Sequence, residues 1–233
     1  MKRAILTSIG GCMGPADFRA QTLLPYARTE LPAFAQAYGQ DPEVRCWLDD
    51  LAMDAGNICM DRVLVEVLQG WIEQDHPHPA LAALEGMIWE QGYRQGRFQS
   101  PLYPDVVPAL RAWQASGHAL HTWDVASAAA QQRHFRFSQA GDLRPLFAGW
   151  FDAMIGARDE PASYRRIAAR TGREPGDVVF LSGNVAELDA ARDAGLATVR
   201  LDRHADQSAP RTVAAAHGHV RVESFGQILP DAR

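Results

Sequence analysis

Short apolar runs alternate with amphipathic segments in two separate parts of the chain. Residues 3–8 form an apolar run that leads into Gly10 and Gly11, which is typical of a buried parallel strand that opens into a loop. After residue 100 the pattern predicts strands at 118–123, 151–155, 177–182 and 197–201, separated by helices at 106–116, from about 126, at 161–171 and at 187–194. This alternation predicts βαβ units and a parallel sheet.

A helical block interrupts the alternating pattern. From about residue 18 to 95 apolar residues recur with helical spacing, in segments at 22–38, 42–56, 60–74 and 80–93. We therefore predict an α/β fold with a Rossmann-like parallel-sheet core, formed by residues 1–17 and 99–233. An all-helical cap, residues 18–98, is inserted after the first strand.

The layout also predicts where a binding site lies. Ligands of open parallel sheets bind outside the carboxyl ends of the strands. These ends fall at Ser8, at Trp123 and Asp124, at residues 155–156 and at residues 182–183. We expect the helical insert, which leaves from the first of these ends, to cover this edge as a lid and to exclude water.

Composition narrows the class of protein. The 233 residues are 47% hydrophobic and 22% charged, which are ordinary globular values. A net charge of −5 argues against a nucleic-acid partner, and no apolar run approaches the length of a membrane helix. The three cysteines, with no CxxC spacing, favour reduced thiols. We expect a soluble cytoplasmic protein.

Several stretches carry a family resemblance. In chain order they are LLPYARTELPAF (23–34), LEGMIWEQGY (84–93), YPDVVPAL (103–110), GDLRPLF (141–147), FDAMIGARDEPASYRRIA (151–168) and FLSGNVAELDAARDAG (180–195). Over nearly its whole length the chain resembles the acireductone synthases, the enolase-phosphatases of methionine salvage in the haloacid dehalogenase superfamily. The resemblance implies the fold predicted above and a magnesium-dependent phosphatase ancestry.

The residues that such phosphatases use are altered. The family has a nucleophilic Asp after the first strand, an acid/base carboxylate two residues later, a hydroxyl and a Lys that hold the phosphoryl group, and an Asp that helps to hold magnesium. The matching positions here are Ser8, Gly10, Asp124, Arg158 and Gly183. Because the metal carboxylate positions are Ser8 and Gly183, we expect no magnesium cofactor and no efficient phosphatase.

Other residues of these motifs are predicted to line the same site. Glu187 remains from the last motif and Ser127 from the second. Trp123, at a strand end, is expected to point into the site and to stack on a flat ligand. The complete set of expected lining residues is Gly10, Cys12, Trp123, Ser127, Gly183, Asn184 and Glu187.

Two charged residues allow alternative interpretations. Asp124 is either a general base or the N-cap of the helix that carries Ala128–Ala130, and both roles are compatible. Arg158 is either an anion clamp or one member of an ion pair with Asp124 or Glu187. Because Asp124 adds a negative charge, we favour the ion pair and expect Asp124 to face Arg158.

Two residues near the first strand also have alternatives. Ser8 is a nucleophile or, as we favour, a small replacement for the lost Asp, since no GxSxG motif or neighbouring His surrounds it. Cys12 is a reactive thiol near a helix start or, as we favour, a small packing residue. We interpret His76, His78, His121 and His134 as loop or packing residues, because their spacing matches no metal motif.

Two functions from different classes remain open. The first is a repurposed, metal-independent enzyme acting on a small polar metabolite, with Asp124 as base, Arg158 as anion clamp and Ser8, Cys12 and Ser127 as donors. The second is a non-catalytic pseudoenzyme that binds a small ligand or a partner protein. Residual acireductone synthase activity is a third possibility, which the altered motifs disfavour.

Overall fold

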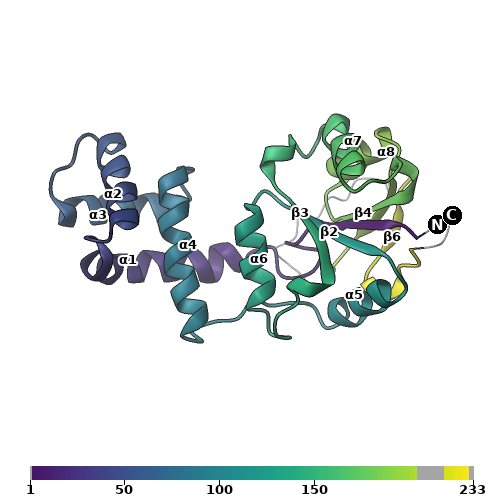
Figure 1. Ribbon diagram of the computed structural model, residues 1–233, viewed down its shortest axis with the longest axis horizontal. Helices are drawn as coiled ribbons and strands as arrows, with labels where there is room; N and C mark the ends of the chain where they lie inside the picture. The colour runs from purple at the N-terminus through teal and green to yellow at the C-terminus, as the bar shows by residue number, and fades with distance from the viewer. Residues whose placement is uncertain (1, 204–217, 231–233) are drawn as a thin grey trace. The chain divides into compact units, whose positions relative to one another are not determined.

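The computed structural model describes residues 2–203 and 218–230. The chain forms two compact units (Figure 1). The first combines the chain up to Asp17 with the chain from Ser100 onward, and the second runs from Phe18 to Gln99. Each unit is described by itself below.

A six-stranded parallel sheet forms the centre of the first unit. Its strands are β1 (Ala4–Thr7), β2 (Ala119–Trp123), β3 (Phe147–Phe151), β4 (Val178–Ser182), β5 (Ala197–Leu201) and β6 (Val220–Val222). Their order is β3-β2-β1-β4-β5-β6, and every neighbouring pair is parallel. The predicted α/β fold with a parallel sheet is therefore confirmed.

Both faces of the sheet are buried. Consecutive residues of a strand point to opposite sides, so neighbouring residues join different core clusters. Ile5 joins one core cluster with Val179, Phe225 and residues of α5 (Val106–Ala115). Leu6 joins the other with Phe180 and residues of α7 (Pro161–Arg170) and α8 (Val185–Asp193). A further helix, α6 (Ala128–Arg136), follows β2. The continuous apolar runs of β1 and β4 follow from this two-sided burial.

The third strand lies earlier in the sequence than predicted. It spans Phe147–Phe151, whereas residues 151–155 were expected to form it. Residues Ala153–Ile155 instead make one 3-10 turn, because the carboxylate of Asp152 accepts a hydrogen bond from the N–H of Met154 at 3.1 Å. Strand β6 was not predicted, because three residues are too few to give a pattern.

The second unit consists of helices in its described residues. A π-helix, η1 (Arg19–Leu23), leads into α1 (Leu24–Tyr38), followed by α2 (Pro42–Asp54), α3 (Asp61–Glu73) and α4 (Pro79–Arg94). Asp41 caps α2, and the ring of His78 caps α4 by accepting from the N–H of Ala80 at 3.2 Å. No helix within residues 2–203 and 218–230 is long and apolar enough to cross a bilayer.

The helical unit contains a buried carboxylate, that of Glu85. It lies on α4 with 3% of its surface exposed, and Arg19 of η1 approaches it, with Nη2 3.4 Å from Oε2. The same guanidinium also pairs with Asp75, in the connection between α3 and α4. Burial raises the pKa of Glu85 from 4.5 to about 7, with the charge of Arg19 opposing the shift.

This pKa makes the stability of the helical unit depend on pH. The unfolded chain releases the Glu85 proton first, so stability is greatest below pH 4.5 and falls as the pH rises to about 7. The full loss is on the order of 3 kcal/mol. We expect Glu85→Gln to remove this part of the pH dependence and to be more stable than the wild type at pH 8. Urea unfolding at pH 5 and pH 8 measures both effects, with exposed Glu66→Gln as control. An unchanged pH dependence in Glu85→Gln would contradict the assignment.

Candidate functional site

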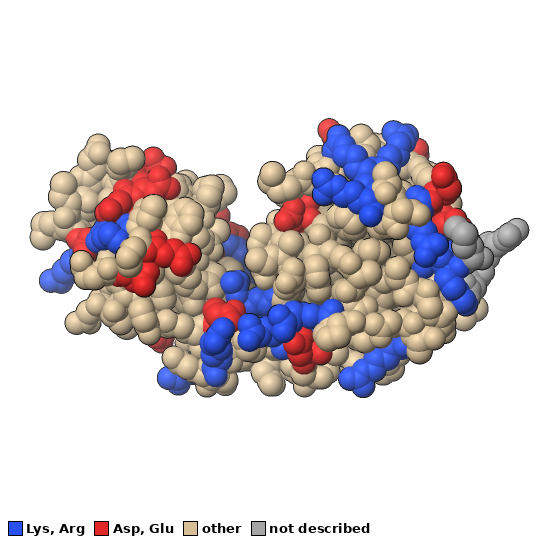
Figure 2. All heavy atoms as spheres, viewed as in Figure 1, with Lys and Arg blue, Asp and Glu red and all other residues tan. Residues whose placement is uncertain are grey.

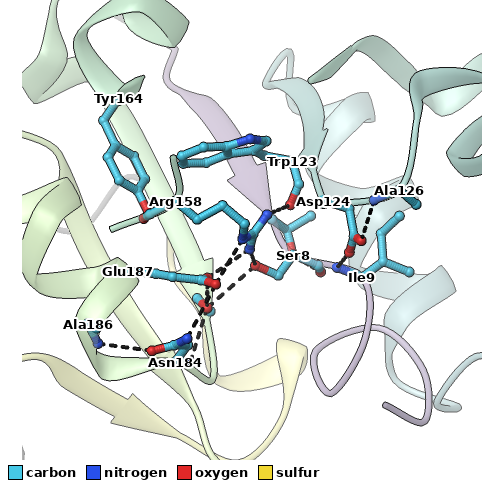
Figure 3. Close-up of polar contacts among 12 residues, drawn as sticks. Ser8, Ile9, Trp123, Asp124, Ala126, Arg158, Tyr164, Asn184, Ala186 and Glu187 are labelled. Carbon is cyan, nitrogen blue, oxygen red and sulfur yellow. Dashed lines mark hydrogen bonds and ion pairs between the residues drawn. The ribbon is translucent and has the colours of Figure 1, made fainter. Parts of the chain in front are cut away.

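The ends of the central strands bring several of the predicted site residues together, among them Ser8, Arg158 and Glu187 (Figure 3). Ser8 follows β1, Asp124 follows β2 and Ser182 ends β4, so all three lie at the carboxyl edge of the sheet. Arg158 comes from the segment before α7, and its side chain lies among these strand ends in Figure 3. Glu187 reaches the same place from the first turn of α8.

Arg158 and Glu187 form the central contact of the site. Nε donates to Oε1 at 2.8 Å and Nη2 to Oε2 at 2.7 Å, a two-pronged ion pair. The side chains are only 16% and 12% exposed. Burial works against the charge of Arg158, but the hydrogen bonds and charge of Glu187 outweigh it and raise the pKa of the guanidinium. Arg158 therefore stays charged, and the carboxylate of Glu187 compensates its charge.

The remaining groups of Arg158 are also engaged. Nη2 donates to Ser8 Oγ at 2.6 Å, and Nη1 donates to the main-chain carbonyl of Trp123. The guanidinium carbon lies 4.9 Å from the centre of the Trp123 ring. The hydroxyl of Tyr164 donates to the carbonyl oxygen of Arg158 at 2.8 Å and holds its backbone in place. The orientation of Arg158 is thus fixed from three sides.

A chain of hydroxyl groups closes the network. Ser8 Oγ donates to Ser182 Oγ at 3.4 Å, and Ser182 Oγ donates to Glu187 Oε2 at 2.8 Å. Asn184 contributes Nδ2, 3.4 Å from Glu187 Oε1, while its own Oδ1 caps α8 by accepting from the N–H of Ala186 at 3.0 Å. Donors therefore run from Arg158 through both serines back to Glu187.

Arg158 forms the favoured ion pair, but its partner is Glu187 and not Asp124, so the expectation that Asp124 would face Arg158 is wrong. The carboxylate of Asp124 instead accepts main-chain hydrogen bonds from Ile9 at 3.4 Å and from Ala126 at 3.2 Å. These N–H groups hold it at the turn after β2, while Glu187 takes both prongs of the guanidinium. Asp124 remains close enough for its charge to raise the pKa of Arg158 further.

Asp124 is also not the cap of α6. The helix begins later, at Ala128, and Ser127 caps it by accepting from the N–H of Ala130 at 3.2 Å. The turn before it is fastened by Gln131, whose amide donates to the carbonyls of Ala126 and Phe151. The Ser127 hydroxyl is therefore engaged in capping the start of α6.

Trp123 does not offer its ring to a ligand, which corrects a second expectation. The side chain is fully buried, 4.6 Å from the ring of Tyr164 and 6.2 Å from that of Phe180, measured between ring centres. Strand alternation turns it toward the core formed with α7 and α8. Its one polar neighbour in the network is the guanidinium of Arg158.

Cys12 packs as an apolar residue. It has no exposed surface, and burial raises the pKa of its thiol to about 12, so the reactive thiolate is not formed at neutral pH. Its carbonyl oxygen accepts from Arg203 at 2.8 and 3.1 Å, which ties the loop after β1 to the end of β5. This agrees with the packing alternative.

Comparison with known proteins identifies the family. No family model matches the chain. The enolase-phosphatase E1 of Stenotrophomonas maltophilia is 50% identical over 226 residues, covering 97% of this chain and 98% of that protein. Those of Xylella fastidiosa and Azotobacter vinelandii are 45% and 41% identical, covering 98% and 99% of this chain and 98% of each relative. The chain belongs to the enolase-phosphatase E1 family.

Solved structures support the same fold. The UTR4 protein of Saccharomyces cerevisiae matches with a TM-score of 0.83 at 25% identity, covering 98% of this chain and all of that one. CbbY from Rhodobacter sphaeroides, solved in complex with phosphate, matches with a TM-score of 0.59 at 17% identity over 97% of this chain and 96% of that one. The second likeness concerns the fold alone.

The residues at the strand ends do not fit the magnesium ion of an enolase-phosphatase. Magnesium needs oxygen ligands that include one or two carboxylates. Ser8 and Gly183 supply none, Glu187 is held by Arg158, and both oxygens of Asp124 accept main-chain N–H groups. Within the described chain no three His, Cys, Asp or Glu residues lie together as a metal site. We therefore derive no reaction step through a metal.

The two glycines mark where side chains are absent on a preserved backbone. A Cβ atom on Gly10 would lie 3.6 Å from Ala16 Cα, an ordinary contact. A Cβ atom on Gly183 would lie 3.3 Å from the carbonyl oxygen of Leu201, which requires a shift of a few tenths of an ångström. Neither glycine has a positive φ. The backbone therefore admits a Cβ atom at Gly10, and at Gly183 only after a small shift.

The histidines lie outside this network. Burial lowers the pKa of His121 and of His134 to about 4, so both are neutral. His78 contacts Asp54 at 2.8 Å.

Two further members of the site, Ser182 and Tyr164, were not predicted from the sequence, although the position of Ser182 at a strand end was a usable signal.

Arg158 and Glu187 are expected to be strongly coupled in their effect on stability. Arg158→Met leaves a buried carboxylate without its partner, which costs about 3 kcal/mol of unfolding free energy. Adding Glu187→Gln removes the uncompensated charge and should recover much of this loss. Chemical denaturation of the wild type, both single variants and the double variant measures the coupling. Additive losses in the double variant would contradict the paired geometry.

Proposed function

We propose that this member of the enolase-phosphatase E1 family has lost magnesium-dependent phosphoryl transfer and acts as a non-catalytic protein. The self-compensated Arg158–Glu187–Ser8 network supports this most directly. A phosphoryl group needs an uncompensated cation, and here the guanidinium of Arg158 is neutralised by a carboxylate at hydrogen-bond distance. In this proposal the protein is cytoplasmic and binds a small molecule or a partner protein.

The surroundings of Ser8, at the position where the family is expected to have its nucleophile, support the same proposal. Ser8 is 5% exposed, accepts from Arg158 and directs its own proton to Ser182. An activated hydroxyl needs a base as its acceptor, and Ser182 is a hydroxyl. Asp124 adds a negative charge at the same edge, which disfavours a phosphate there.

A direct assay tests the loss of phosphatase activity. We expect the purified chain with magnesium to hydrolyse a diketo-phosphopentane or para-nitrophenyl phosphate at least about a thousandfold more slowly than an intact E1 enzyme, because nucleophile and metal carboxylates are both absent. Phosphate release at a rate within tenfold of that enzyme would contradict the proposal.

Restoring the motif residues provides a stricter test. The combination Ser8→Asp, Gly10→Glu, Asp124→Ser, Arg158→Lys and Gly183→Asp should gain magnesium-dependent hydrolysis by at least about a hundredfold. Gly10 admits a Cβ atom directly, and Gly183 admits one after a small shift. The matched control carries the other four changes without Ser8→Asp and should stay inactive. A folded, magnesium-binding restored variant without hydrolysis would show that these five positions do not account for the loss.

One observation favours a metal-independent enzyme as a second candidate. Asp124 is half-buried at the sheet edge, and no described residue forms a salt bridge with its carboxylate. Two main-chain N–H groups orient it, as a general base needs. If a screen of small polar metabolites finds turnover, Asp124→Asn should abolish it, and unchanged turnover in that variant would remove Asp124 from this role.

A further inference from the structure

Helix α3 of the helical unit carries two separate apolar rows. Leu64, Leu68 and Ile72 are buried and face the interior of the unit. A second row, Met60, Val63, Val67 and Gly70, recurs at steps of three, four and three residues on another side of the helix. Met60 is 65% exposed and Val63 is 40% exposed. We call this second row the outer face of α3.

The end of α2 lies beside the start of the outer face. Met53, in the last turn of α2, is 63% exposed. The connection folds back, because the N–H of Ile58 donates to the carbonyl of Ala52 at 3.0 Å and that of Gly56 to Met53 at 3.2 Å. Gly56 adopts a φ of +100° in this turn. Met53 and Met60 therefore lie on either side of a hydrogen-bonded turn between α2 and α3.

The outer face also has room for a close neighbour. A Cβ atom on Gly70 would meet nothing within 4 Å, so another backbone can approach α3 at this position. Methionine side chains adapt their shape to an incoming apolar surface. A row at three- and four-residue spacing is the surface into which the side chains of a second helix fit.

The surroundings of the outer face are strongly acidic. Residues 41–75 contain nine Asp and Glu against two Arg, Arg45 and Arg62. Arg45 pairs with Asp49 and Asp61, and Arg62 pairs with Glu66. From outside this range Arg19 pairs with Asp75 and Arg28 with Glu73, and the carboxylates still exceed the cations. Figure 2 shows Asp and Glu gathered on this unit with few Lys or Arg among them. Like charges oppose a second copy of the same face.

We propose that the outer face of α3, together with Met53, binds an amphipathic helix with a basic polar side from another protein. Its apolar side covers Met60, Val63 and Val67, and its Lys or Arg residues meet the surrounding carboxylates. The charge complementarity selects this partner over a second copy of the chain. The proposal concerns the helical unit and does not depend on the loss of phosphatase activity.

Synthetic peptides test the proposal on the full chain. The probe is a helical Leu–Lys peptide with one apolar side, and the comparison probes are a permuted peptide of the same composition and a Leu–Glu peptide. We expect calorimetry to show salt-sensitive binding of the amphipathic Leu–Lys peptide alone. Equal binding of the permuted peptide would show that charge attraction alone explains the binding, and it would overturn the proposal. The absence of binding by any of the peptides would overturn it as well.

Two variants localise the binding. Gly70→Gln fills the open position, and since Gln favours a helix more than Gly it should not destabilise α3. Met60→Ser with Val63→Ser removes the exposed side chains. Each variant should weaken binding of the Leu–Lys peptide at least about tenfold. Leu229→Ser, which removes an exposed apolar residue from the other unit, should leave the affinity unchanged. Unaltered affinity in Gly70→Gln and in Met60→Ser with Val63→Ser would also overturn the proposal.

Discussion

The two-pronged contact between Arg158 and Glu187 is the interaction on which the site depends. It joins the segment before α7 to the first turn of α8, and through Ser8 and Ser182 it reaches the ends of β1 and β4. A buried ion pair is tolerated only when its remaining groups are hydrogen-bonded. The carbonyl of Trp123, both serine hydroxyls and Asn184 meet this requirement. The charges at the sheet edge are consequently satisfied within the protein.

The scaffold around this network is that of the enolase-phosphatase E1 family. The parallel sheet is packed on both faces, and the backbone admits a Cβ atom at Gly10 directly and at Gly183 after a small shift. At the strand ends, Ser8 and Gly183 supply no carboxylate, and Arg158 binds Glu187. The fold of an enolase-phosphatase E1 chain therefore does not by itself specify phosphoryl transfer.

The sequence predicted the fold better than the contacts within the site. Continuous apolar runs mark β1 and β4 because both sheet faces are buried, and this is a local signal. The site's location also followed, since parallel strands end at one edge. The partner of Arg158 did not follow, because Asp124 and Glu187 are equally charged and only the main-chain N–H groups of Ile9 and Ala126 decide between them. Trp123 was misplaced because its position at a strand end does not reveal which sheet face it points to.

The most direct measurement is the ¹⁵N NMR signal of the Arg158 Nε–H group while phosphate and magnesium are added. The account predicts a signal that exchanges slowly with water, because Nε–H donates to Glu187 at 2.8 Å, and that stays in place as both ions are titrated. A variant with Glu187→Gln should shift this signal and speed its exchange. A saturable movement of the wild-type signal with phosphate would contradict the account, because it would show that the guanidinium is available to an anion.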